Sequence, residues 1–399
     1  MRRTFMLKSS PVAYDHEENV KLSIQLNRWL LKPLGVWPKS ADLSRLKKFI
    51  YVTVNVVCLC LICFLLVPSV VFMAVEIEGT YNTIKLTGPL SFCLMTIAKY
   101  SSLICRESYI CSGLRHIEDD WTNTRYYGDR MIMIRNAKFG RRLVTICAFF
   151  MYGGAVFYYL ALPFSNGKIK DADLNLTYRP LLFPVARIIA DARYSPVSEI
   201  FFWVQCLAGF IAHSITAGAC SLAAAFAMHA CGRLEVLMEW IEHLVDGRED
   251  LCDNVDERLT MIVQQHVRIL RFISLTDTLM REISAVEIIG CTLNMCLLGY
   301  YTIMEWDNKT NIITYIILYM SFMFNIFIFC YIGELIAGQK LDPANLTYYV
   351  ALIREHSGMS YLGIPDAGLI RENLGMPYQD IARLESDQGT RRHALLRNA

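Results

Sequence analysis

Six long apolar stretches constrain this chain more than any other feature of its sequence. The clearest covers 49–75 and holds no charged residue. At 1.5 Å per residue it is long enough to cross a hydrocarbon core of about 30 Å. Lipid offers the backbone no hydrogen-bond partner, so stretches of this length must be helices. We therefore predict an all-α, polytopic helical membrane protein. Its six predicted spans are 49–75, 86–104, 143–162, 200–231, 283–304 and 312–336.

Lys and Arg are divided unevenly between the segments that join these spans. On one side, 1–48 holds 10 of them, 105–142 holds 8, 232–282 holds 6 and 337–399 holds 7. On the other side, 76–84 holds none, 163–199 holds 5 and 305–311 holds 1. Positive charge is retained on the cytosolic side of membranes. The pattern therefore predicts that the N-terminus and both long loops are cytosolic.

Two N-glycosylation sequons agree with this orientation. Asn175 and Asn308 each begin an Asn-X-Thr triplet in a loop that is predicted to lie outside. A third sequon, at Asn345, lies on the predicted cytosolic side and is expected to stay unmodified. The first residues lack an apolar core, so we expect no cleavable signal peptide.

Composition narrows the class of protein further. The 399 residues are 54% hydrophobic with a mean hydropathy of +0.33, which is typical of a membrane protein. A net charge of +2 favours no nucleic-acid partner. The fourteen cysteines avoid the outer loops, which predicts small buried side chains and no disulfide framework. The sequence holds no G-x-S-x-G, H-E-x-x-H or P-loop signature, so we expect no enzyme, no metal site and no cofactor.

Three segments outside the spans have distinct characters. In 232–282, apolar residues recur at helical spacing and predict two amphipathic cytosolic helices. The N-terminal segment 1–48 holds an apolar stripe, and its Trp29 and Trp37 suit an interfacial helix. The segment 338–399 has no apolar run of span length, and we expect it to be a poorly ordered cytosolic tail.

Polar residues within the spans allow more than one interpretation. His213 and Gln205 lie inside the fourth span, where a polar side chain contacts either a pocket or another helix. Lys99 and Glu287 lie near the predicted cytosolic ends of their spans. We expect both to extend toward water, and we assign them no role. We interpret the acids at 118–120 as a solvated cytosolic face.

Aromatic residues gather in the outer halves of several spans. An apolar, aromatic cavity with few polar groups suits a small volatile or lipophilic ligand. For any one residue, an interfacial aromatic belt with ordinary helix packing is the alternative. The group includes Phe92, Tyr152, Tyr158, Phe202, Tyr315 and Tyr319.

Three stretches resemble the insect odorant receptor family, in the form found in ants, bees and wasps. Residues 31–38, LKPLGVWP, are similar to the segment that precedes the family's first span. In the second stretch, residues 178–180 and 194–205 are similar to its second outer loop and the start of the fourth helix. Residues 329–336, FCYIGELI, resemble the signature that ends its sixth helix. The resemblance covers residues 15–337.

This resemblance implies a subunit of a tetrameric, ligand-gated cation channel that pairs with an odorant receptor co-receptor. It also implies a place in the plasma membrane of olfactory neuron dendrites. The odorant would bind in the outer halves of helices two, three, four and six, and would open the channel by binding the open state more tightly. The ligand-binding positions carried over are Phe92, Tyr152, Tyr158, Phe202, Gln205, His213, Tyr315 and Tyr319.

The chain departs from the family after Gly338. The family continues into a seventh, pore-lining helix, which the sequence of 339–399 does not match. We therefore expect an incomplete pore domain, and a non-conducting truncated isoform or a gene-model product is the alternative interpretation. A G-protein-coupled receptor or a small transporter is less favoured. The charge pattern places the N-terminus inside, and the sequence shows no inverted repeat.

Overall fold

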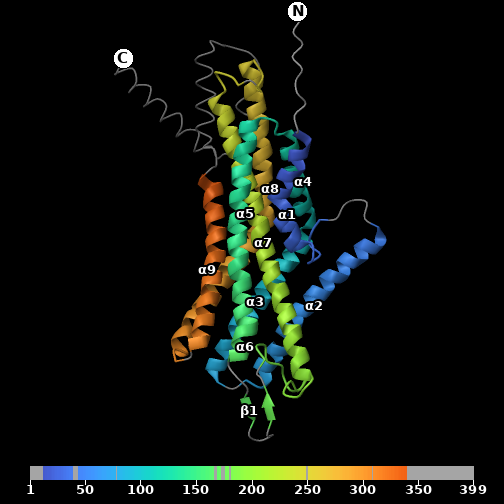
Figure 1. The fold of residues 1–399 in the computed structure, drawn as a ribbon, viewed down its shortest axis with the longest axis vertical. Helices are drawn as coiled ribbons and strands as arrows, with labels where there is room; N and C mark the ends of the chain where they lie inside the picture. Colours follow the sequence, from blue (N-terminus) through green and yellow to red (C-terminus); the bar gives the residue numbers. More distant parts are fainter. Residues whose placement is uncertain are drawn as a thin grey trace, which may run out of the picture. The chain divides into compact units, whose positions relative to one another are not determined.

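The computed structural model describes residues 12–38, 44–77, 79–165, 169–171, 176–178, 181–248, 250–307 and 309–338. Figure 1 shows that this part of the chain is a helical bundle with one short hairpin. Several sequence predictions lie outside the described residues. They are the sequons at Asn175, Asn308 and Asn345, and the predictions for 339–399, namely a poorly ordered cytosolic tail that lacks a family-type seventh helix.

Six helices in the described part of the chain are long and apolar enough to cross a membrane, which confirms the predicted fold class. They are α2 (Arg45–Val75), α3 (Thr80–Cys105), α5 (Tyr127–Val156), α7 (Val197–Glu242), α8 (Val255–Met304) and α9 (Lys309–Gly338). The π-helical turn η1 (Phe157–Ala161) and α6 (Leu162–Ser165) continue α5. The remaining elements are α1 (Val12–Leu31), α4 (Glu107–Asn123) and the antiparallel strands β1 (Ile169–Asp171) and β2 (Leu176–Tyr178).

The helices extend well beyond the apolar stretches that predicted them. The segment 105–142, which we expected to be a loop, is almost entirely helical, because α4 fills 107–123 and α5 begins at Tyr127. In α4 the side chains of Ile110, Leu114 and Ile117 recur at helical spacing and are buried. A hydropathy average detects only the apolar part of a helix. The amphipathic part that extends beyond it is not detected.

The predicted helices of 232–282 are continuations of membrane helices. Helix α7 runs unbroken for 46 residues, and α8 runs for 50 residues after a turn that begins beyond Glu242. We call the end of the bundle that carries α4 and the α7–α8 turn the α4 end. "The hairpin end" means the end that carries α6 and the two strands (Figure 1).

Helix α7 lies at the centre of the bundle, where it contacts α1, α2, α3, α5, α8 and α9. Its residues 212–224 are all buried, and most of them are Ala, Gly, Ser or Cys. Small residues let helix backbones approach closely in a membrane, where no hydrophobic effect drives helices together. A Cβ atom at Gly218, for example, would lie 2.7 Å from a side-chain carbon of Leu31 on α1.

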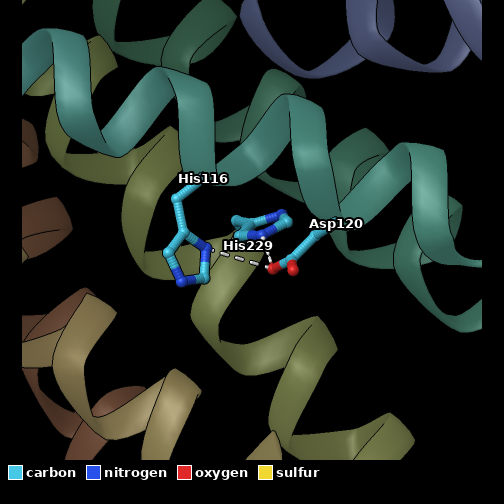
Figure 2. Close-up of side chains that lie close together, drawn as sticks. All are labelled: His116, Asp120 and His229. Atoms are coloured by element: carbon cyan, nitrogen blue, oxygen red, sulfur yellow. Dashed lines mark hydrogen bonds and ion pairs between the residues drawn. The ribbon is translucent and has the colours of Figure 1, made fainter.

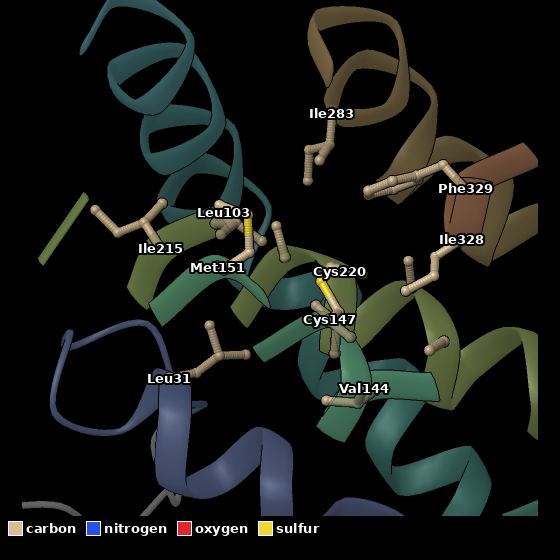
Figure 3. Close-up of a cluster of buried hydrophobic side chains, with 14 of the residues drawn as sticks. Leu31, Leu103, Val144, Cys147, Met151, Ile215, Cys220, Ile283, Ile328 and Phe329 are labelled. Atoms are coloured by element: carbon tan, nitrogen blue, oxygen red, sulfur yellow. The ribbon is translucent and has the colours of Figure 1, made fainter. Parts of the chain in front are cut away.

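A single hydrophobic core joins these helices. Figure 3 shows Leu31 of α1, Cys147 and Met151 of α5, and Ile215 and Cys220 of α7 in one cluster. All fourteen cysteines are free thiols, and several of them fill the core. Helix α1 also packs along α7 and α5, while its Trp29 remains 61% exposed.

Candidate functional site

An aromatic cluster forms around His213 where four elements meet. The ring of Phe92 on α3 lies 4.8 Å from the His213 ring on α7, centroid to centroid. Tyr159 of η1 lies 5.9 Å from His213, and Phe322 of α9 lies 6.0 Å from Phe92. Tyr158 joins through Tyr159, with ring centroids 5.2 Å apart. We call these five residues the His213 cluster.

The Tyr159 ring of this cluster packs directly against the backbone of α7 at a glycine. Gly209 lies one helical turn before His213, and a Cβ there would fall 2.2 Å from Cζ of Tyr159. Only glycine therefore lets the tyrosine ring lie flat against α7. The Nδ1 atom of His213 lies 2.9 Å from the Gly209 carbonyl oxygen, which fixes the plane of the imidazole ring.

Gln205 holds a loop over the hairpin end of this cluster. Its Nε2 atom donates to the carbonyl oxygen of Phe183 at 2.6 Å, and the Phe183 amide donates to its Oε1 atom at 3.4 Å. The Phe183 ring is buried and stacks on Tyr159 at a centroid distance of 6.4 Å. In this structure Gln205 therefore anchors a loop, because both Nε2 and Oε1 of its side chain are bonded to the backbone of Phe183.

Tyr315 belongs to a polar network at the hairpin end. Its hydroxyl donates to Oε2 of Glu305 at 3.0 Å, and Tyr81, Lys85 and Asn311 also donate to that carboxylate. Burial raises the pKa of Glu305, but the hydrogen bonds from Lys85, Tyr81 and Asn311 outweigh it and leave the pKa below its usual value. The network ties α3 to the α8–α9 connection.

The other predicted positions lie around the periphery. The Tyr152 hydroxyl donates to Oγ of Ser214 at 2.9 Å, so this tyrosine joins α5 to α7. The Phe202 ring lies 5.9 Å from Phe164, farther toward the hairpin end. Tyr319 is 37% exposed. Of the eight predicted positions, the structure thus brings Phe92, Tyr158 and His213 into one cluster.

A buried ion pair that the sequence reading dismissed lies next to this cluster. Nζ of Lys99 lies 2.7 Å from Oε2 of Glu287, and these side chains are 0% and 1% exposed. Lys99 also donates to Oγ1 of Thr216 at 2.7 Å, and Asn325 donates to Glu287. The pair thus connects α3, α7, α8 and α9. The same Nζ atom lies 6.0 Å from the centroid of the Phe92 ring.

The expectation that Lys99 and Glu287 extend toward water was therefore wrong. Glu287 lies deep inside α8, because that helix already begins at Val255. Lys99 lies in the last two turns of α3, but its side chain is directed into the bundle, where Nζ donates to Glu287 and Thr216. Two opposite charges inside apolar spans were the available signal, because intramembrane charges usually pair with each other. The identity of the partner required the fold, since the two residues lie 188 positions apart.

A second charged centre lies at the α4 end. Oδ2 of Asp120 on α4 lies 2.9 Å from Nε2 of His229 on α7 and 3.3 Å from Nδ1 of His116 (Figure 2). Arg268 of α8 lies 2.9 Å from the other carboxylate oxygen, and Arg233 lies 3.6 Å from Oδ2. Asp120 is 3% exposed, so the prediction that it belongs to a solvated face was wrong for this acid.

The arrangement around Asp120 indicates an ion-pair centre. Its histidine and carboxylate donor atoms lie within 4.8 Å of one another, as they do in a metal site. Two guanidinium groups beside the same carboxylate would repel a divalent cation. Burial raises the pKa of Asp120, but hydrogen bonds from His116 and His229 and the charge of Arg233 outweigh it and hold the pKa far below its usual value.

Two crevices in the described part of the chain lie away from the His213 cluster. One is lined by residues of α1, α4, α5 and α7, and includes Asn27, Trp121 and His229. The other lies between the 32–38 turn and the start of α2. Neither is lined by any of the eight predicted ligand positions. The rings of the His213 cluster pack against one another in this conformation.

Comparison with known proteins places these features in a family. The sequence model of the family described as 7tm Odorant receptor matches residues 80–350. The match continues beyond residue 337, where we expected the resemblance to end. No curated protein matches the sequence significantly.

Two solved structures of the insect olfactory receptor OR5 from Machilis hrabei are similar in fold. The structure in complex with eugenol is 15% identical in sequence, with a TM-score of 0.66, over 84% of this chain and 84% of that chain. The other OR5 structure is also 15% identical, with a TM-score of 0.66, over 90% of this chain and 96% of that chain. At this identity the likeness shows the fold alone.

Proposed function

The chain belongs to the insect odorant receptor family, and on that premise we propose that it is a subunit of an odorant-gated cation channel. Its ligand is a small volatile or lipophilic molecule, and its partner is an odorant receptor co-receptor in a heterotetramer. The chain is a multi-pass membrane protein. We further propose that it lies in the plasma membrane of olfactory neuron dendrites with a cytosolic N-terminus, as the charge pattern favours.

The observation that carries this proposal is the His213 cluster beside the Lys99–Glu287 pair. Aromatic rings from α3, η1 and α9 surround the imidazole of His213 on α7 there, and the other polar groups of the cluster are the hydroxyls of its two tyrosines. An apolar ligand gains affinity from ring contacts, and an imidazole can hydrogen-bond its polar atom. Because the rings already touch, a ligand enters only if the helices that carry them shift.

Such a shift gives the site a route to gating. Lys99 and Asn325 tie α3 and α9 to the same carboxylate of Glu287, directly beside Phe92. A ligand that separates α3 from α7 therefore acts on this network as well. It opens a channel only to the extent that it binds the open arrangement more tightly than the closed one.

The test is current recorded from cells that express this chain with a co-receptor. Eugenol is the first probe, because a similar fold holds it, and a panel of volatile compounds follows. Phe92→Ala removes a buried ring, whereas the control Phe149→Ala removes a ring that is 72% exposed on α5. We expect Phe92→Ala to raise the half-maximal concentration by about tenfold, the equivalent of about 1.4 kcal/mol. The control is expected to leave it unchanged, and equal responses of parent and Phe92→Ala would contradict this site.

A non-conducting subunit is the second candidate function. The sequence after Gly338 holds no apolar run of span length, which favours it. The discriminating experiment replaces 339–399 by a seventh helix of the family type. Odorant-evoked current that appears only with the replaced chain, and not with this chain as it stands, would support the non-conducting interpretation. Current from this chain as it stands would exclude it.

A further inference from the structure

A basic crevice lies at the corner between α1 and α2. The chain leaves α1, turns through 32–38 and re-enters the bundle as α2. Between the turn and the first turns of α2 lies a crevice of about 760 Å³. Arg28, Lys32 and Lys47 line it, together with the apolar side chains of Trp37, Ile50 and Val54.

The wall of this crevice is preformed. Gly35 has a φ of 71°, and the bonds Gly35 N–H to Lys32 O (3.1 Å) and Val36 N–H to Leu31 O (3.2 Å) close α1 with a Schellman motif. The hydroxyl of the fully buried Tyr100 donates to the carbonyl oxygen of Leu34 at 2.7 Å. The turn, which carries Lys32, is thus fixed to α3, while Arg28 and Lys47 lie on the flanking helices α1 and α2.

Among the described residues, the three cations of the crevice have no acidic partner. Arg28, Lys32 and Lys47 are all exposed, and within the described residues none of them lies in an ion pair. Other exposed cations of the bundle do pair: Lys21 lies 2.8 Å from Glu17, and Arg135 lies 2.8 Å from Glu235. Three like charges around one opening create a positive potential that favours an anion.

The surface beside the crevice is apolar. On α2, Phe49 is 68% exposed, Ile50 is 51% exposed and Val52 is 55% exposed, in the helix with the highest hydropathy of the chain. The cations therefore lie where α2 enters the hydrocarbon. Trp37 is half-buried at the same level, the depth at which indoles lie in membrane proteins. A ligand that fits must carry an anionic head and an apolar tail.

We propose that this crevice binds an anionic glycerophospholipid. Its phosphate would lie among Arg28, Lys32 and Lys47, and its acyl chains would lie along the exposed face of α2. Basic pockets beside membrane helices bind such headgroups on the cytosolic side. The cytosolic orientation proposed above places the crevice in the leaflet that contains anionic lipids. The inference does not depend on odorant recognition.

Native mass spectrometry of the detergent-purified chain tests the proposal. The protein is exchanged into equal amounts of phosphatidylserine and phosphatidylcholine, and the ratio of bound lipids is measured. The triple variant Arg28→Gln/Lys32→Gln/Lys47→Gln is compared with Arg115→Gln/Arg125→Gln/Arg271→Gln. The control variant removes three other exposed cations, which lie on α4, between α4 and α5, and on α8. The measurement uses solubilised protein, so it stays informative if the chain proves not to conduct.

We expect the parent and the control variant to retain phosphatidylserine preferentially, and the crevice variant to lose that preference by at least about tenfold. Each basic residue near a membrane surface contributes about fivefold to the attraction of an anionic lipid. Equal retention by parent and crevice variant would overturn the proposal. Displacement of the lipid by millimolar inorganic phosphate would overturn it as well, because the site would then be one for a free anion.

Discussion

At the scale of single residues, the ion pair of Lys99 and Glu287 holds four helices together, because Thr216 and Asn325 bond to the same two side chains. The sequence indicates such side chains more readily than it indicates their partners. His213 was singled out because a histidine inside an apolar span is rare, and Phe92 because aromatic residues gather in the outer halves of several spans. Lys99, Glu287 and Asp120 were misread, because their partners lie on other helices and the sequence does not show which helices meet. Gln205 was found, but its bond to the Phe183 backbone depends on a loop whose path the sequence does not show.

The buried ion pair leads to the first prediction. Glu287→Gln leaves the Lys99 ammonium buried without its counter-charge, and breaking a buried pair in this way costs about 3–5 kcal/mol. The matched control Glu17→Gln breaks an exposed pair with Lys21 and is expected to cost at most about 0.5 kcal/mol. Thermal unfolding of the purified variants, followed by loss of the monodisperse peak, measures both. A Glu287→Gln variant as stable as Glu17→Gln would show that the pair is not formed.

Asp120 leads to a prediction about pH. Its pKa is lower in the folded state than in the unfolded state, so its stabilising contribution is present above the unfolded value of about 3.9 and is lost as pH falls below that value. The difference in melting temperature between the parent and Asp120→Asn should therefore stay constant from about pH 8 to pH 5. It should shrink below about pH 4. A difference that vanishes between pH 7 and pH 5 would assign the effect to the neighbouring histidines instead.

At the scale of elements, apolar length located six helices but not their ends. The predicted span 200–231 lies within α7, a helix of 46 residues. This helix continues through 232–242, where Leu234 and Leu237 are buried. Residues 127–142 belong to α5 although they are rich in charge. Hydropathy reports the contact with lipid, whereas these extensions are stabilised by neighbouring helices at the α4 end, and that packing is invisible to a window average.

Helix packing leads to a prediction about two glycines. In Gly209→Ala the new methyl group meets the Tyr159 ring, with Cβ 2.2 Å from its Cζ atom, and such overpacking costs about 1–3 kcal/mol. At Gly153 on α5 no described atom outside the local helix lies within 4 Å of the new Cβ, so Gly153→Ala should be neutral or slightly stabilising. Melting temperatures compare the two. Because Tyr159 lies in the His213 cluster, Gly209→Ala should also shift the odorant response, and an unchanged response would separate Tyr159 from the ligand site.

At the scale of the whole molecule, the sequence predicted a membrane bundle but not the arrangement of its helices, and its predicted orientation stays a prediction. The central place of α7 follows from its small residues, which the sequence contains, but the helices that surround it are chosen by long-range packing. Asn175 and Asn308 test the orientation. Both sequons should carry glycan in cells, and Asn345 should not, as shown by glycosidase-sensitive mobility of single Asn→Gln variants. A glycan at Asn345 instead would reverse the orientation.

The central claim is that a volatile ligand binds among the rings around His213. The most direct test is photolabelling of the purified chain with a diazirine analogue of an activating odorant, followed by mass spectrometry of the labelled peptides. We predict labels on the α3 segment that carries Phe92 and on the α7 segment that carries His213, and we predict that excess unmodified odorant removes them. Labels confined to lipid-facing positions such as Phe149, or labels that odorant does not displace, would contradict the account.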